Sequence, residues 1–378
     1  MTTNVTRIAE EEFQQSKTSE TGMAYQMLKD CVRQTIKYML CLLLYYSGIL
    51  FLFKMAKKFI GTKNEIKIIA YHGVNNGPFY INMFVSKQKF ESQIKHLKRH
   101  FQIIGMAEAE EIIKSQKRIN NDFVVITVDD GYKDNYENVF PIAVKYRIPM
   151  TMYLTTGCIT DSCPTTVYYL ILAIHSTTEK SLDLSSQGLR KFELGSREKR
   201  ERAILDIDRH ARGLSYKERE EFLEQVLSSL GFGKENPIFQ NRMLSWDEVN
   251  EMVQQGIVIG GHSVTHPILS RLPLEEAERE IRECREEIQK RTGRKVTLFA
   301  YPYGDADSIS DQIVDLVRRS DFSSAVVLYQ KRNSAEALHA LGRTLVRDDM
   351  TSNPFGSYSE AVFSCEMSGL LDTLFWRE

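Results

Sequence analysis

The sequence predicts an α/β protein whose parallel strands close into a barrel. From Ile66 onward, short apolar runs of strand length alternate with stretches of helical periodicity. Several of these runs end in acids, histidines or glycines, and the helical stretches carry capping signals. Strands that alternate with helices and present polar residues at their ends are typical of a parallel barrel with its site at one face.

Six apolar runs are candidate strands, and they span residues 66–73, 123–128, 150–155, 256–261, 297–304 and 325–329. The clearest candidate helix spans residues 246–255. Ser245 and Glu248 have the spacing of a capping box at its start, and Gly256 ends its pattern.

A second candidate helix spans about residues 274–291 and is rich in charge. Glu275 with Arg279 and Glu278 with Arg282 are spaced four apart, so we expect them to pair along a solvated face. A charge pattern of this kind needs no partner molecule.

The chain divides into four parts, namely a polar flexible tail (1–30), an apolar helix (31–63), the barrel (64–350) and a C-terminal packing or interaction segment (351–378). Residues from about 164 to 240 are rich in charge and helical in pattern. We expect a helical insertion there, without strands, above or beside the face of the barrel at which the strands end. A lid, a dimer contact and a lipid-facing surface remain open as its role, and the oligomeric state is not predicted.

Residues 38–53 carry no charge, but these sixteen residues are fewer than the roughly twenty that a spanning helix needs. Lys37 and Lys54 flank the run and can snorkel. Three interpretations are open: a short or tilted membrane helix, a monotopic anchor, and a helix docked on the rest of the protein. We favour membrane association. If the helix spans a membrane, the denser positive charge after the run predicts that the barrel lies in the cytoplasm. The alternative is a soluble cytoplasmic protein.

Composition excludes one class of partner. Lys and Arg number 49 against 50 for Asp and Glu, so no basic field points to nucleic acid. The six cysteines are scattered, and only Cys158 and Cys163 are near one another in sequence. They form no disulfide framework, and a reducing compartment fits at least as well as an exported one.

Two adjacent carboxylates, Asp129 and Asp130, follow the β-branched run 123–128. Successive side chains of an extended segment point to opposite faces, so one carboxylate can bind an ion while the other stays free. Gly131 lets the chain turn sharply and brings backbone N–H groups close to the site. Acids at the end of a buried strand lie where α/β folds keep their active sites.

Two imidazoles, His262 and His266, follow the glycine-containing run 256–261. They are four residues apart, so one helical turn or a tight loop places both rings on one side. Two imidazoles and a carboxylate suit a divalent metal, with zinc as our first choice and cobalt, nickel or iron as alternatives. Together with a free acid they are the parts of a metal-assisted hydrolase.

Two further runs end in polar or aromatic residues. Tyr301, Pro302 and Tyr303 are either strand-end packing or a pocket wall that stacks on a sugar ring or orients a substrate carbonyl. His72 ends the run 66–73, where an imidazole can protonate a leaving amine.

These motifs carry a family resemblance. Residues 127–131 resemble the first signature of the polysaccharide deacetylase family, the NodB-homology carbohydrate esterases, whose usual form is Thr-Phe-Asp-Asp-Gly. Residues 262–267 resemble the second signature, and residues 299–304 the Phe-Ala-Tyr-Pro variant of the third. Residues 71–74 are similar to the first-strand motif of the branch that deacetylates poly-N-acetylglucosamine. The resemblance covers roughly residues 66–348 and implies a distorted (β/α)7 barrel, with seven rather than eight strands.

Carried over residue by residue, the resemblance implies that Asp130, His262 and His266 bind the metal. It implies that Asp129 is the general base that activates water. The backbone N–H of Tyr132, at the strand end, is then a candidate donor to the oxyanion.

The chain departs from the better-known branch of the family in two places. That branch has an arginine before the Pro-aromatic of the third motif, which pairs with the base, and a late Leu-x-His that supplies the general acid. No arginine precedes Pro302 here. Arg343 resembles a late-strand arginine of the Phe-Ala-Tyr-Pro branch and can orient Asp129 from elsewhere, unless it is a surface arginine. The register of His339 does not match, so His72 is our preferred second acid–base group.

We therefore predict a metal-dependent deacetylase that hydrolyses the N-acetyl group of an amino sugar in a glycan or a sugar-linked substrate, with O-acetyl as second choice. Two alternatives remain. One is a deacylase, such as a deformylase, of a lipid-linked amino sugar, and the other is a carbohydrate-binding barrel without turnover.

Overall fold

The protein is described here by a computed structural model of the 378-residue chain, which places residues 29, 31–60, 66–77, 83–116, 122–329, 331 and 333–371. Its contacts divide the chain into two units. The larger unit spans residues 63–348, and the smaller one combines residues 1–62 with residues 349–378. The predicted polar tail lies outside the described residues, apart from residue 29.

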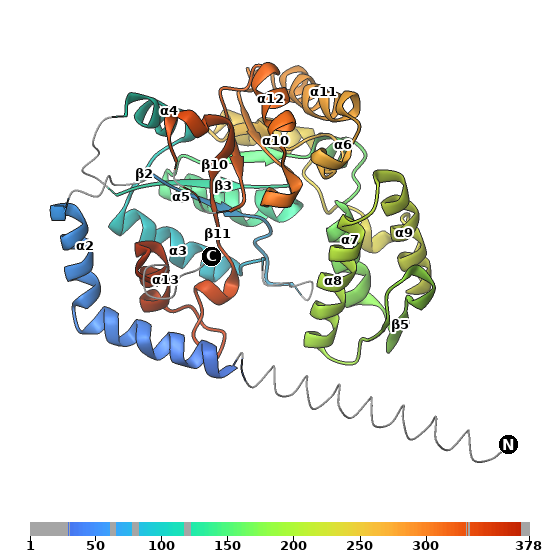
Figure 1. The fold of residues 1–378 in the computed structure, drawn as a ribbon, viewed down its shortest axis with the longest axis horizontal. Helices are drawn as coiled ribbons and strands as arrows, with labels where there is room; N and C mark the ends of the chain where they lie inside the picture. The colour runs from blue at the N-terminus through green and yellow to red at the C-terminus, as the bar shows by residue number, and fades with distance from the viewer. Residues whose placement is uncertain are drawn as a thin grey trace, which may run out of the picture. The chain divides into compact units, whose positions relative to one another are not determined.

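A parallel sheet forms the centre of the larger unit (Figure 1). Its strands are β1 (Lys67–Tyr71), β2 (Gln102–Ile103), β3 (Phe123–Val128), β4 (Thr151–Leu154), β7 (Val258–Gly261), β8 (Leu298–Ala300), β9 (Ser324–Val327), β10 (Leu341–Gly342) and β11 (Thr344–Leu345). They pair in the order β10-β9-β8-β7-β4-β3-β1-β11, and β2 pairs with β3.

The last two strands close the sheet into a barrel. β10 and β11 are halves of one segment, interrupted only at Arg343, and they pair with β9 on one side and with β1 on the other. Within the described residues, six continuous strands and this divided one therefore make seven positions around the barrel. The predicted seven-stranded barrel is confirmed.

The strands are buried on both sides, as their apolar and β-branched sequences predict. All six residues of β3 are buried, and the same holds for the four of β4 and of β9. Gly260 of β7 lies between two neighbouring strands: a Cβ there would meet the Tyr153 ring at 2.5 Å and the Leu298 carbonyl oxygen at 2.8 Å. The glycine thus permits the close strand approach directly before His262.

Helices surround the strands (Figure 1), and they are α3 (Lys87–His100), α4 (Met106–Ser115), α5 (Phe140–Tyr146), α10 (Trp246–Gln254), α11 (Leu274–Thr292) and α12 (Asp311–Arg319). Short helical turns are Asn135–Val139, Ser185–Gln187, Pro237–Phe239, Leu269–Arg271, Ala306–Ser308, Ala335–Ala340 and Asp348–Met350. The predicted capping box is present at the start of α10, where the Ser245 side chain and Glu248 bond each other's backbone N–H.

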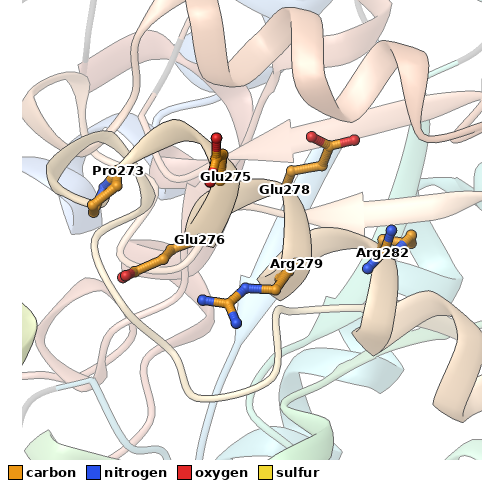
Figure 2. A pocket seen from close by; sticks show the side chains of 6 residues that line it. All are labelled: Pro273, Glu275, Glu276, Glu278, Arg279 and Arg282. Atoms are coloured by element: carbon orange, nitrogen blue, oxygen red, sulfur yellow. The ribbon is translucent and has the colours of Figure 1, made fainter.

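The outer face of α11 is charged and exposed, but its predicted ion pairs are wrong. Neither expected pair forms between these described residues, and Arg282 instead lies 3.9 Å from Glu283 and 3.8 Å from Glu286. Exposed ion pairs contribute only a few tenths of a kcal/mol, so they do not fix which neighbouring charge a long side chain contacts. Figure 2 shows this face, where a pocket is lined by Pro273, Glu275, Glu276, Glu278, Arg279 and Arg282.

The short helix α6 (Thr156–Thr160) follows β4. The insertion comes next and contains α7 (Thr166–Ser176), β5 (Ser181–Asp183), β6 (Lys191–Glu193), α8 (Arg197–Arg212) and α9 (Tyr216–Ser229). The expectation of an insertion without strands is wrong, because β5 and β6 form an antiparallel hairpin. Each strand buries one apolar residue, Leu182 opposite Phe192. A single alternation is too short to stand out in a sequence.

The smaller unit joins the apolar N-terminal helices to the C-terminal helix α13 (Glu360–Ser368). Cys41, Leu44 and Leu50 form a buried cluster with residues of and after α13. No single described helix meets the length and hydropathy needed to cross a membrane. Cys31–Tyr46 and Ile49–Ala56 meet it only as a pair, with a 71° bend between them; Ile49–Ala56 belongs to α2 (Ile49–Ile60).

Candidate active site

The predicted site residues follow strands of the barrel. Asp129 and Asp130 follow β3, His262 follows β7 and His72 follows β1, while Arg343 lies at the break in the seventh strand. Because all these strands run parallel, their carboxyl ends meet at one edge of the barrel. Asp130 has the left-handed backbone conformation (φ 75°), so the chain turns directly at the carboxylate pair.

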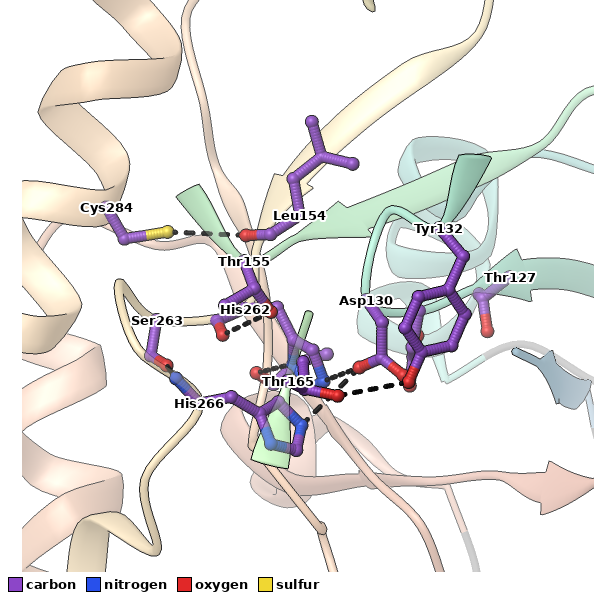
Figure 3. A network of polar contacts seen from close by, with 12 residues as sticks. Thr127, Asp130, Tyr132, Leu154, Thr155, Thr165, His262, Ser263, His266 and Cys284 are labelled. Carbon is purple, nitrogen blue, oxygen red and sulfur yellow. Dashed lines mark hydrogen bonds and ion pairs between the residues drawn. The ribbon is translucent and has the colours of Figure 1, made fainter. Parts of the chain in front are cut away.

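Asp130, His262 and His266 converge on one point (Figure 3). The Oδ1 atom of Asp130 lies 3.3 Å from Nε2 of His262 and 3.4 Å from Nε2 of His266. The three ligand atoms lie within 4.8 Å of one another, and all three side chains are buried. The structure therefore brings together the three residues that the sequence assigns to a metal.

The hydrogen bonds of this cluster fit a cation. Nδ1 of His262 lies 2.7 Å from the Ala300 carbonyl oxygen, which can only accept, so Nδ1 carries a proton. In the neutral ring Nε2 then presents a lone pair towards Asp130 Oδ1, which has no hydrogen-bond partner among the described residues. Two facing lone pairs repel each other, and a divalent ion between them removes the repulsion.

The charges of the cluster lead to the same fit. Burial lowers the pKa of His266 to about 3, so its ring is neutral, as a ligand must be. Burial opposes ionisation of Asp130, but the nearby imidazoles hold the pKa of its carboxyl well below the usual range. Burial also opposes protonation of His262, yet the two carboxylates raise its pKa overall. A proton on Nε2 of His262 would thus occupy the position between His262 and Asp130 that a cation would otherwise take.

Asp129 and Arg343 form a buried ion pair beside the cluster. Nη1 and Nη2 of Arg343 each donate to one oxygen of Asp129 at 2.7 Å, and Nη1 also donates to Thr127 Oγ1 at 3.0 Å. Arg343 is only 1% exposed, so its interpretation as a surface arginine is wrong. Burial would raise the pKa of Asp129, but the guanidinium lowers it below its usual value and keeps the carboxylate ionised.

His72 and Tyr132 lie at the same edge of the barrel. His72 is buried, and among the described residues its Nδ1 has no hydrogen-bond partner. The Tyr132 hydroxyl lies 3.2 Å from Thr165 Oγ1, and burial beside Asp130 raises its pKa well above the usual value. Among the described residues, the Tyr132 backbone N–H has no partner. The catalytic roles of both residues remain predictions.

Tyr301, Pro302 and Tyr303 of the third motif have different surroundings in the structure. The Tyr301 hydroxyl donates to the His339 carbonyl oxygen at 2.7 Å, and its ring packs edge-on against Phe299. Tyr301 is thus used in packing, and Pro302 is buried in the turn that follows it. Only Tyr303 reaches the cluster, with its ring centroid 4.9 Å from that of His266.

Sequence reasoning missed a residue that holds the loop of the two histidines. Glu280 of α11 accepts the backbone N–H of Val264 at 2.8 Å, the N–H of Thr265 at 2.9 Å and the Thr265 hydroxyl at 2.7 Å. The interpretation of the whole charge run as a solvated face is therefore wrong at this position. The sequence around Glu280 does not indicate this contact, because several other glutamates lie nearby in the same helix and nothing distinguishes the one that faces the loop.

Comparison with known proteins agrees with the geometry. Residues 116–324, more than half of the chain, match the family model described as polysaccharide deacetylase. YxkH of Bacillus subtilis strain 168, a protein named for the polysaccharide deacetylases, is 19% identical over 300 residues, which is 79% of this chain and 77% of that protein.

Two other proteins are similar to this chain, one over a short segment and one in its fold. The poly-β-1,6-N-acetyl-D-glucosamine N-deacetylase of Staphylococcus aureus strain N315 is 32% identical over 114 residues, which is 27% of this chain and 39% of that protein. The structure of the Streptococcus pyogenes deacetylase PplD in complex with acetate aligns with a TM-score of 0.51 at 17% identity. It covers 78% of this chain and 97% of that one, which shows a shared fold. On the match to the family model, the chain belongs to the polysaccharide deacetylase family, whose members are hydrolases of carbon–nitrogen bonds other than peptide bonds.

Proposed function

We propose that this protein is a metal-dependent deacetylase that hydrolyses the N-acetyl group of an amino sugar. One observation carries the proposal: a buried set of Asp130, His262 and His266 lies beside a second carboxylate, Asp129, that is kept ionised by Arg343. Burying two carboxylates costs free energy that a folded protein retains only where the charges are used.

Each residue has a defined task in this reaction. Asp130, His262 and His266 are the residues that hold the ion, and zinc suits their donor set, as do cobalt, nickel and iron. A divalent ion supplies Lewis acidity, which acidifies water and polarises an amide carbonyl. Asp129 accepts the proton of the attacking water, because Arg343 donates to both of its oxygens, which fixes the carboxylate in place and keeps it ionised.

The remaining groups act on the other atoms of the amide. The Tyr132 N–H donates to the carbonyl oxygen as negative charge develops on it. His72 gives a proton to the nitrogen as the carbon–nitrogen bond breaks, so that acetate and a free amine leave. A glucosamine-type sugar is proposed as the substrate because the Staphylococcus aureus relative is named for that activity, although the match covers a minor part of both chains.

Acetate release tests the function directly. We expect the purified full chain, loaded with zinc or cobalt, to release acetate from N-acetylglucosamine oligomers of β-1,6 or β-1,4 linkage, and to stop when EDTA removes the metal. A formylated lipid-linked amino sugar serves as the parallel substrate for the deacylase alternative. Glycan binding without release of either acid, with each metal, would favour the silent carbohydrate-binding barrel and contradict the proposal.

We also propose that the smaller unit lies on a membrane surface as a monotopic anchor. Its N-terminal helices bury Cys41, Leu44 and Leu50 against residues of and after α13. Their other side exposes more than half of each of six large apolar side chains, namely Ile36, Met39, Leu43, Tyr46, Phe51 and Leu52. A patch of this kind is typical of a protein or membrane contact. The cytoplasmic position of the barrel stays a prediction.

Vesicle binding tests the anchor. We expect the double variant Leu43→Glu/Phe51→Glu to lose at least tenfold in binding to phosphatidylcholine–phosphatidylglycerol vesicles in a sedimentation assay. Each apolar side chain contributes about 1.5–3 kcal/mol when it leaves water, which the charged replacement removes. Val258→Glu, an exposed position on the barrel, is the control and should bind as the unchanged protein does. Equal vesicle binding by the unchanged protein, the double variant and Val258→Glu would contradict the proposed anchor.

A further inference from the structure

The insertion brings two arginines to the metal-ligand cluster. Arg212 of α8 lies over the ring of Tyr303, with 4.5 Å from its guanidinium carbon to the ring centroid. Arg219 of α9 points Nη1 at the Tyr303 hydroxyl, 3.3 Å away. The same Tyr303 ring lies against His266. The helices α8 and α9, which pack with α7 beside the barrel in Figure 1, thus reach the site through one tyrosine.

The two arginines differ in how their charge is balanced. Arg212 pairs with Asp208 at 2.8 Å and with Asp305 at 3.1 Å, so its charge is compensated. Arg219 has no ion pair among the described residues, although it is only 3% exposed. Within the part of the chain that the structure describes, its Nε and Nη2 atoms have no hydrogen-bond partner. The nearby carboxyl of Asp208 accepts from Arg212 through Oδ2 only, and among the described residues its Oδ1 makes no hydrogen bond to Arg219 or to any other group.

A buried guanidinium with idle donors is costly. Removing an ion from water costs several kcal/mol unless a partner compensates it, and buried donors are normally satisfied. Nε and one Nη of an arginine form a fork that matches the two oxygens of a carboxylate or phosphate. In Arg219 both idle donors, Nε and Nη2, belong to one such fork, while Nη1 is held by Tyr303. The arrangement lacks an anion with two oxygens.

We propose that Arg219 binds an anionic group, a phosphate or a carboxylate, on the amino sugar that is deacetylated at the neighbouring site. The inference rests on the proposed function and narrows its substrate class to N-acetylated sugars that carry a negative charge. Tyr303 contacts both Arg219 and His266, so the anion and the acetamido group of one sugar unit bind on either side of that ring. Arg219 is then a residue of substrate specificity contributed by the insertion.

The test compares three sugars that differ in charge. N-acetylglucosamine 1-phosphate carries a phosphate, N-acetylmuramic acid a carboxylate, and N-acetylglucosamine no charge. A charge-assisted hydrogen bond is worth about 1.5–3 kcal/mol, or about tenfold or more. We expect Arg219→Met to raise KM and lower kcat/KM at least tenfold for one of the charged sugars, which identifies the anion, and less than threefold for the neutral one. Arg219→Lys should retain part of the preference.

A matched control and a second readout keep the outcomes separate. Arg197→Met removes the same charge from an exposed position of the insertion and should change none of the three values. Calorimetric binding to the EDTA-treated chain should show tighter binding of a charged sugar than of the neutral one. If no sugar releases acetate, the proposed function fails while this binding preference still decides the inference. Equal binding of all three sugars, or an equal loss for charged and neutral sugars in Arg219→Met, would overturn it.

Discussion

Replacing Asp129 with Asn is expected to leave metal binding intact and to remove nearly all turnover. Asn cannot accept a proton from water, and a positioned general base contributes about 10²–10⁴-fold to the rate. The metal-binding atoms belong to Asp130, His262 and His266 and are untouched by the change. The measurement is acetate release together with zinc content per folded chain, with folding checked by circular dichroism.

His262→Ala is the matched variant and is expected to lose both the metal and the activity. His262 joins Asp130 on one side and the Ala300 carbonyl on the other, so no other described side chain takes its place. The two variants therefore separate a ligand from a base. Equal zinc loss in Asp129→Asn and His262→Ala would contradict the roles assigned to them.

Replacing Arg343 with Met is expected to destabilise the barrel and to move the pH dependence of activity. Removing one partner of a buried ion pair costs about 3–5 kcal/mol, because the other charge is left uncompensated. An arginine neighbour lowers an aspartate pKa by about 1–3 units. Without it, burial raises the pKa of Asp129, so the acid limb of the kcat/KM profile should shift to higher pH.

The contribution of Asp129 to the pH dependence of stability should have opposite signs in the unchanged protein and in Arg343→Met. In the unchanged protein the pKa of Asp129 is lowered on folding, so its contribution is present above the unfolded value of about 3.9 and is lost as the pH falls through the folded pKa. In Arg343→Met the folded pKa is raised. The free energy of unfolding should then decrease as the pH rises above about 4.

A double variant controls for simple misfolding. Asp129→Asn/Arg343→Met removes both charges and should recover part of the lost unfolding free energy, while activity stays absent. Denaturant unfolding of the four proteins gives the coupling between the two side chains. If the double variant loses the sum of the unfolding free energies lost by the two single variants, the ion pair does not couple Arg343 to Asp129.

The barrel was predictable because its signals are local. The six candidate strands are apolar runs of the right length, and the carboxylates and histidines follow them directly in sequence. Parallel strands bring their carboxyl ends together whatever the loops between them do. The juxtaposition of Asp130 with His262 and His266 thus follows from strand ends, without any knowledge of the insertion.

Contacts made by distant side chains were harder to predict. Arg343 lies 214 residues from Asp129, and only the resemblance to one branch of the family suggested their pairing. Glu280 and Arg219 stand among many charged neighbours on helices that look solvated in sequence. Whether such a residue faces water or the site depends on how its helix packs, which periodicity alone does not fix when charges occupy both faces.

The central claim is that three side chains hold one ion between them. Anomalous X-ray scattering from crystals of the zinc-loaded protein measures the position of that ion directly. We predict one peak about 2.0–2.2 Å from Asp130 Oδ1, His262 Nε2 and His266 Nε2. A zinc-loaded crystal with no peak among these three atoms, or with its zinc bound elsewhere on the chain, would contradict the account.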